Sequence, residues 1–249
     1  MNTGEKSFHS ETFRLLGFEP ELSGVAERIL VDTESRLEKT LPESIRQWYR
    51  RNGAVQILAE HSNDDPPIAV EHFEIIQWKS RQLVPFRNEN QGVCTWALEL
   101  DGSDDPPVYV DLDTEGKEWQ LSSPTFSQYV FSCVWDGRMV MQKPASVQAQ
   151  NRVLSDTALD ALRALMQQEI QTHGWPGSNN YRFINEHGAI LIWASEEQAD
   201  WFVASCDASG LEIVLRAIWD LDDVGLSLYD TSEIGRSVIA RLRDHHGQT

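Results

Sequence analysis

The segment between residues 89 and 113 constrains the fold more than any other part of the chain. It reads ENQGVCTWALELDGSDDPPVYVDLD, with alternating apolar side chains on both sides of an acidic, proline-containing stretch. A period of two is typical of strands, and the two prolines remove backbone donors from the stretch between them. We therefore predict a β-hairpin with strands at 93–100 and 108–113 and an acidic loop at 101–107. The second strand should be half-buried, with Val108 and Val110 inward and Tyr109 and Asp111 toward solvent.

Part of this segment is duplicated. SDDPPVYV at 103–110 nearly repeats NDDPPIAV at 63–70, and the dipeptide Trp-Asp occurs at 135–136 and at 219–220. Such repeats would suit a β-propeller. However, the sequences that surround the two blocks do not match, and several other stretches have helical periodicity. We therefore interpret each block as a local turn.

The rest of the chain mixes helices and strands without regular β-α-β alternation, which favours the α+β class. Helices are predicted at 23–39, 40–53, 126–135, 155–174, 209–219 and 232–243. Further strands are predicted at 68–76, 181–184, 189–194, 200–206 and 224–229. The polar stretch 142–152 is predicted to be a linker, so we expect one domain at 1–143, followed at 144–249 by either an extension of the same sheet or a small second domain.

Two predicted helices carry capping signals. Thr40 and Glu43 have the spacing of a capping box, and Gly53 is expected to end that helix in a left-handed conformation. Thr125 is expected to cap the helix at 126–135. Apolar faces are predicted for both helices, and they comprise Ile45, Trp48 and Tyr49 in the first and Phe126, Tyr129, Val130 and Cys133 in the second.

Charge limits the choice of partner. The chain has 39 Asp and Glu against 21 Lys and Arg, a formal net charge of −18. Such a field repels nucleic acids and anionic membranes and attracts basic proteins, although solubility alone is the alternative explanation. No apolar run approaches the ~20 residues of a membrane helix, and the first twenty residues lack a signal-peptide core. With its odd number of scattered cysteines, we expect a cytoplasmic protein with reduced thiols.

Motifs for catalysis or cofactor binding are not found in the sequence. The seven histidines and three cysteines show neither His-x-x-x-His nor Cys-x-x-Cys spacing, and G-x-S-x-G, G-x-G-x-x-G and Walker sequences are missing. A pair of the loop aspartates could in principle act as in a glycosidase, but a solvated loop does not raise a carboxyl pKa for acid catalysis. We predict no catalytic residue, no metal and no cofactor.

Three segments, in this order, resemble one known family. They are LPESIRQWYRRNG at 41–53, ENQGVCTWALELDGSDDPPVYVD at 89–111, and Trp119 followed by TFSQYVFSCVWD at 125–136. The combination resembles the SUKH superfamily, named in part for the fungal Knr cell-wall regulator. The resemblance implies helices packed on an antiparallel sheet for the first 143 residues. The region after residue 144 carries no motif of the family, and its own pattern predicts an appended α/β segment. It also implies cytosolic partner binding, which in the bacterial branch means immunity against a polymorphic toxin that is often a nuclease.

We therefore expect a non-enzymatic immunity protein that binds and neutralises a basic protein toxin; a regulatory scaffold without a toxin partner is the alternative. The predicted partner-binding residues are the eight acids of 99–118, opposed there only by Lys117: Glu99, Asp101, Asp104, Asp105, Asp111, Asp113, Glu115 and Glu118. A nuclease presents a basic cleft to phosphates, so an acidic surface can mimic nucleic acid and steer the encounter. A second acidic stretch at 196–230, where Arg216 is the only base, is the other candidate.

Overall fold

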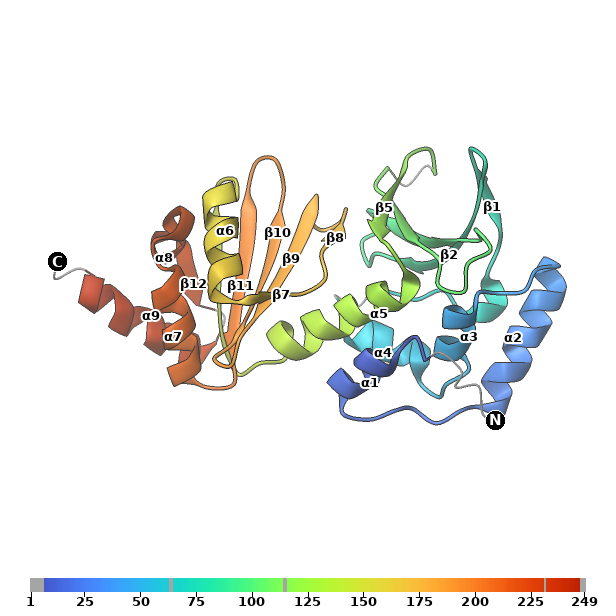
Figure 1. The fold of residues 1–249 in the computed structure, drawn as a ribbon, viewed down its shortest axis with the longest axis horizontal. Coiled ribbons are helices and arrows are strands. Elements are labelled where there is room, and N and C mark those ends of the chain that lie inside the picture. The colour runs from blue at the N-terminus through green and yellow to red at the C-terminus, as the bar shows by residue number, and fades with distance from the viewer. Residues whose placement is uncertain (1–6, 63–64, 114–115, 231, 247–249) are drawn as a thin grey trace. The chain divides into compact units, whose positions relative to one another are not determined.

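A computed structural model describes residues 7–62, 65–113, 116–230 and 232–246. The chain divides into two compact units, Met1–Trp135 and Asp136–Thr249. Each unit combines helices with an antiparallel sheet, so the fold class is α+β (Figure 1). The sequence placed the division at 143/144, whereas residues 136–143 belong with the second unit. In the described ranges, no helix has both the length and the apolar character needed to cross a membrane.

The first unit contains a sheet with strand order β1-β2-β3-β4-β5. Its strands are β1 (Ile76–Trp78), β2 (Arg81–Asn88), β3 (Thr95–Glu99), β4 (Val108–Asp111) and β5 (Trp119–Ser123). Strands β3 and β4 pair antiparallel, with Trp96 opposite Val110, which confirms the predicted hairpin. Strand β2 was not predicted, because Pro85 interrupts its apolar pattern and a β-bulge accommodates it between Pro85 and Arg87.

The helices of this unit cover one face of the sheet (Figure 1). They are α1 (Ser10–Leu16), α2 (Gly24–Leu37), α3 (Glu43–Tyr49), α4 (Ala54–Glu60) and α5 (Phe126–Trp135), with a 3₁₀ turn η1 at Val70–His72. The predicted inward faces of α3 and α5 are confirmed, since Ile45, Trp48, Phe126 and Val130 are all completely buried in this core.

The capping box predicted for α3 is wrong. Pro42 occupies the N-cap position and no side chain caps the helix. The backbone N–H of Leu41 instead donates to the carboxylate of Glu34 on α2. Gly53 does adopt a left-handed conformation, with φ of 72°, but it begins α4, whereas α3 already ends at Tyr49.

The opposite face of the first sheet is also buried, so the prediction of a half-buried β4 is wrong. Tyr109 is 8% exposed and Asp111 is 3% exposed. Tyr109 packs with Leu83, Ala97 and Trp119, and the side chain of Trp78 from β1 packs against this cluster. Burial on both faces explains why alternation alone misassigned Tyr109.

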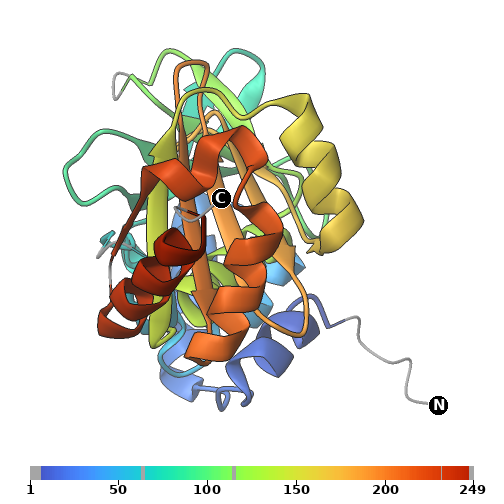
Figure 2. The ribbon, with the colours of Figure 1, turned by 90° about the vertical axis from the view of Figure 1, so that its left-hand side faces the viewer.

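The second unit contains a sheet with strand order β12-β6-β11-β10-β9-β7, and β8 also pairs with β9. The strands are β6 (Ala145–Asn151), β7 (Gln167–Gln168), β8 (Thr172–His173), β9 (Asn179–Ile184), β10 (Ala189–Ala194), β11 (Ala199–Ser205) and β12 (Leu228–Asp230). One face is covered by helices (Figures 1 and 2), namely α6 (Asp156–Leu165), α7 (Ala208–Ile218), α8 (Val224–Ser227) and α9 (Glu233–His246). The 3₁₀ turn η3 (Leu221–Asp223) precedes α8, and the π-helical turn η2 (Asp136–Met141) contacts β10 and β11.

Four predicted elements of the chain are corrected. The linker at 142–152 is strand β6, an interior strand whose inward residues Ala145, Val147 and Ala149 are small enough to hide the alternation. The helix at 155–174 ends at Leu165, because the following residues pair with β9 as β7 and β8. The strand at 224–229 is α8 followed by β12, and the strand at 68–76 is η1 followed by β1.

Candidate protein-binding surface

The loop between β3 and β4 is held at its base by backbone hydrogen bonds. The N–H of Glu99 donates to the carbonyl of Pro107 at 3.0 Å, which closes the hairpin below the loop. The N–H of Ser44, in the first turn of α3, donates to the carbonyl of Asp104 at 2.8 Å. The loop backbone is therefore tied both to its own strands and to a neighbouring helix.

Asp105 ties the same loop to α5. Its carboxylate accepts hydrogen bonds from the backbone N–H of Ser127 at 2.9 Å and from the Ser127 hydroxyl at 2.5 Å. The N–H of Phe126 donates to the Pro106 carbonyl, and the N–H of Gln128 donates to Oγ of Thr125, as the predicted cap requires. These partners satisfy the first N–H groups of α5, which have no acceptor within the helix, and a carboxylate there is also favoured by the helix dipole. Asp105 is thus a helix-capping residue.

Asp101 and Asp104 form the exposed tip of the loop, and we call them the tip pair. Asp101 accepts hydrogen bonds from the N–H and hydroxyl of Ser103, at 2.9 and 2.7 Å, which fixes its carboxylate in a tight turn. Within the part of the chain that the structure describes, neither aspartate of the tip pair makes an ion pair. Both carboxylates are exposed and available to a partner.

Glu99 is not available in this way. Its side chain is buried beside Arg81, whose guanidinium donates to the Glu99 carboxylate at 2.5 Å and to the Tyr109 hydroxyl at 2.7 Å. The hydrogen bond that Arg81 donates to Glu99 raises the pKa of Arg81, and the nearby Tyr109 hydroxyl and the negative charge of Glu99 act in the same direction. Through Arg81, Glu99 therefore stabilises the face of the sheet on which Tyr109 lies.

The remaining predicted acids belong to the turn between β4 and β5. The buried carboxylate of Asp111 accepts from the N–H of Gly116 at 2.7 Å and from the N–H of Asp113 at 3.2 Å, so it shapes this turn. Burial raises the pKa of Asp111, and the hydrogen bond between its carboxyl group and the side chain of Asp113 acts in the same direction, whereas the N–H groups of Gly116 and Asp113 oppose the shift. Asp113 and Glu118 are exposed, and Glu115 lies outside the described residues.

The eight acids are therefore not gathered into one patch. The loop at 100–107 precedes β4, and residues 112–118 come after it. The two connections therefore belong to opposite ends of the strand. The tip pair lies on the connection at one end of β4, and Asp113 and Glu118 lie beyond the other end. Glu99, Asp105 and Asp111 have structural roles.

The first DDPP block uses its second aspartate in the same way as the second block does. Asp65 is buried, forms an ion pair with Arg87, and accepts from the N–H of Asn90 at 3.2 Å. The N–H of Asn88 donates to the Pro66 carbonyl, just as Phe126 does to Pro106. In both blocks, Asp and the first Pro thus present acceptors to a neighbouring segment. The duplicated DDPP blocks in the sequence were the signal for this shared hydrogen-bonding role. We had interpreted each block only as a turn.

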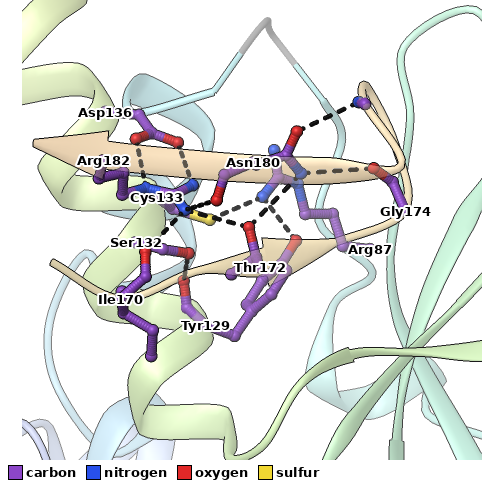
Figure 3. Close-up of polar contacts among 11 residues, drawn as sticks. Arg87, Tyr129, Ser132, Cys133, Asp136, Ile170, Thr172, Gly174, Asn180 and Arg182 are labelled. Carbon is purple, nitrogen blue, oxygen red and sulfur yellow. Dashed lines mark hydrogen bonds and ion pairs between the residues drawn. The ribbon is translucent and has the colours of Figure 1, made fainter. Parts of the chain in front are cut away.

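The guanidinium of Arg87 has further buried partners in the first unit. It donates to the hydroxyl of Tyr129 at 2.8 Å and to Sγ of Cys133 at 3.2 Å (Figure 3), and it lies 4.8 Å from the centre of the Trp96 ring. Every one of these groups is a core residue of the first unit, and a buried charge with this many partners fixes their arrangement. We assign this cluster a structural role.

Several acids of the second stretch, 196–230, also have structural roles. Asp207 caps α7 by accepting from the N–H of Gly210 at 2.8 Å, and Asp222 accepts from the N–H and hydroxyl of Ser155 before α6. The hydrogen bonds from Arg216 and Arg241 lower the pKa of Glu212. The exposed acids of the turn between β10 and β11 are Glu196 and Glu197.

A second arginine centre, also missed from sequence, lies within the second unit. Arg182 on β9 makes a two-pronged contact with Asp136 of η2, at 2.7 and 2.6 Å (Figure 3). Its guanidinium also donates to the Thr172 hydroxyl at 3.1 Å and to the Ile170 carbonyl at 3.2 Å. These contacts hold η2 and the β7–β8 segment on the sheet, and no apolar periodicity could have indicated them.

A cavity of about 390 Å³ opens at the start of α7. It is lined in part by Lys143, His187, Cys206 and Ser209. Nζ of Lys143 donates to Sγ of Cys206 at 3.4 Å, and Cys206 is exposed, unlike the buried Cys94 and Cys133. Burial raises the pKa of the Cys94 thiol to about 12, so that thiol is unreactive.

Among residues 7–62, 65–113, 116–230 and 232–246, no three His, Cys, Asp or Glu side chains are placed to hold a metal ion. Comparison with protein-family models, curated proteins and solved structures found no match to this chain. The tip pair combines exposed carboxylates with a loop that is held at its base, and it is our candidate site in the first unit.

Proposed function

We propose that this chain is a non-enzymatic binding protein that captures a basic protein partner through the tip pair, Asp101 and Asp104. One observation carries the proposal. The loop that bears these two aspartates is fixed at its base, through Pro107, Asp105 and the Asp104 carbonyl. Both carboxylates face solvent, and no cation of the described residues pairs with them.

A fixed loop favours binding because less conformational entropy is lost when the partner docks. Unpaired carboxylates at the rim of an interface mainly raise the association rate, and the net charge of −18 acts in the same direction at longer range. Both effects require a partner with a basic surface.

The partner that we propose is a toxin, in line with the resemblance of residues 41–53, 89–111 and 119–136 to the SUKH superfamily. In that role the chain neutralises the toxin by stoichiometric binding in the cytoplasm. A regulatory scaffold would use the same loop for a partner that is not toxic.

The experiment measures association with the product of the gene immediately upstream, once that product is shown to be toxic, by stopped-flow fluorescence. Asp101→Asn and Asp104→Asn together remove two charges at nearly constant size. We expect association to slow several-fold at 0.01 M salt and the difference to shrink at 0.1 M, where the Debye length falls from ~30 Å to ~10 Å.

The matched control removes the same charge from the second unit, with Glu196→Gln and Glu197→Gln. This pair should leave the association rate nearly unchanged. An equal loss in both double variants would mean that only the overall field matters, and a loss confined to the control would place the site at the β10–β11 turn. If the neighbouring gene product neither binds nor is toxic, the scaffold alternative is favoured.

A further inference from the structure

Lys143 and Cys206 lie together because of strand register. In the β6–β11 pair, Ala145 is opposite Ser205, so the residues just before β6 and just after β11 meet at one end of the sheet. Cys206 directly follows β11, and Lys143 precedes β6 with Pro144 between them; the two residues are 63 apart in sequence, and their Nζ and Sγ atoms are 3.4 Å apart. The contact is therefore set by the sheet and not by a chance meeting of two surface side chains.

Both groups are accessible to small reagents. They line the same cavity of about 390 Å³, together with Met139, His187 and Ser209, and Cys206 is exposed. Hydrogen peroxide is close to water in size and can reach the thiol through this cavity. Lys143 makes no ion pair in the described part of the chain, so its amine is not held by a carboxylate.

We propose that Lys143 and Cys206 form a reversible covalent sulfur–nitrogen bridge when the protein meets hydrogen peroxide. Peroxide first oxidises the Cys206 thiol by two electrons to a sulfenic acid, and one water leaves. The Lys143 amine, having released its ammonium proton to solvent, then attacks the sulfur. The sulfur–nitrogen bond forms, the sulfur–oxygen bond breaks, and a second water carries away the hydroxyl group and one amine hydrogen.

The bridge would fasten the segment that follows η2 to the start of α7. Closing a long loop restricts the unfolded chain, as a disulfide does, so the oxidised second unit should resist unfolding more than the reduced one. The flexible stem of lysine lets Nζ close the remaining distance without a shift of the strands. This inference does not depend on the proposed toxin-binding function.

The test treats the purified full chain with hydrogen peroxide and maps its peptides by tandem mass spectrometry. We expect a linked peptide pair joining Lys143 to Cys206, lighter than the two separate peptides by two hydrogen atoms. Dithiothreitol should reverse the link, because two thiols reduce the bridge and return the free amine and thiol. The midpoint of thermal unfolding should rise by several degrees on oxidation and fall again on reduction.

The control variant Lys143→Arg keeps the positive charge but presents a guanidinium that cannot condense. In it, the sulfenic acid of Cys206 should persist and react with dimedone several-fold more than in the original chain, and no link should form. Cys206→Ser should abolish both signals while Cys94 and Cys133 remain. Oxidation of Cys206 in the original chain to sulfinic acid without a link, a Cys206 disulfide between two copies, or equal dimedone labelling with and without Lys143 would each overturn the proposal.

Discussion

At the scale of single residues, adjacent aspartates of one loop have different tasks. Asp105 accepts from the backbone and side chain of Ser127, whereas the Asp104 carboxylate faces solvent. We predict that Asp105→Ala lowers the free energy of unfolding by about 1–2 kcal/mol, as the loss of a helix cap does. Asp104→Ala should stay within about 0.5 kcal/mol of the unchanged chain. Urea denaturation of both variants measures the difference, and equal effects would show that the cap is not formed.

His9 is a buried histidine that links the start of α1 to α3. One ring nitrogen, Nε2, lies 2.8 Å from the carbonyl of Ser44, and the ring packs against Trp48 and Phe126. Burial lowers the pKa of His9 to about 4, while the Ser44 carbonyl and the charge of Asp105 oppose the shift and Arg51 adds to it. The neutral imidazole is therefore the form that the folded first unit accepts.

This shift predicts acid sensitivity. Because the folded pKa lies below the ordinary value of 6.5, the unfolded chain binds the proton more tightly. Stability is thus fully present above pH 6.5 and is lost as the pH falls toward 4, by up to about 3 kcal/mol. His9→Gln keeps a donor for Ser44 but does not titrate, so its urea-denaturation stability should fall less over this range. Parallel pH profiles for the two proteins would contradict this assignment.

At the scale of elements, the sequence predicts those segments whose apolar pattern has one dominant period. The β3–β4 hairpin, α5 and the strands β9 to β11 belong to this group. The pattern fails where long-range pairing decides the structure. The helix predicted to continue to residue 174 ends at Leu165, because Gln167 pairs with Ile184 of β9. It also fails in β6, where alanines provide the inward face.

The candidate site was predictable only in part. The excess of acids in 99–118 is visible in the sequence, but the hydrogen-bond or ion-pair partner of each carboxylate is not. Asp105 finds its partner 22 residues away at Ser127, and Glu99 finds Arg81 on another strand. Such contacts appear only once α5 and β2 are in place, so the sequence could propose eight acids, and the geometry assigns structural roles to Glu99, Asp105 and Asp111.

At the scale of the whole molecule, the chain divides before η2 and not after it. Asp136 is the first residue of the second unit and pairs with Arg182 of β9. We predict that a fragment of residues 136–249 unfolds cooperatively on heating, at a midpoint several degrees above that of a fragment of residues 144–249. The shorter fragment leaves the Arg182 guanidinium without its carboxylate, which is costly for a charge held among other polar groups.

Thermal unfolding followed by circular dichroism compares the two fragments. Asp136→Asn in the longer fragment separates the lost ion pair from the lost packing of η2, and it should fall between them. Equal midpoints for all three proteins would mean that residues 136–143 contribute nothing to the second unit.

Because exposed and anchoring aspartates are separate residues in the DDPP loop, the loop can change in sequence during evolution without losing its structure. Substitutions at Asp101 and Asp104 alter what the loop presents to another molecule without touching the hydrogen bonds at its base. Substitutions at Asp65 or Asp105 act on the architecture and are expected to be eliminated. In a collection of descendants we therefore expect rapid divergence at the two exposed positions beside strict retention at the two anchoring ones, so that new specificities can arise on an unaltered frame.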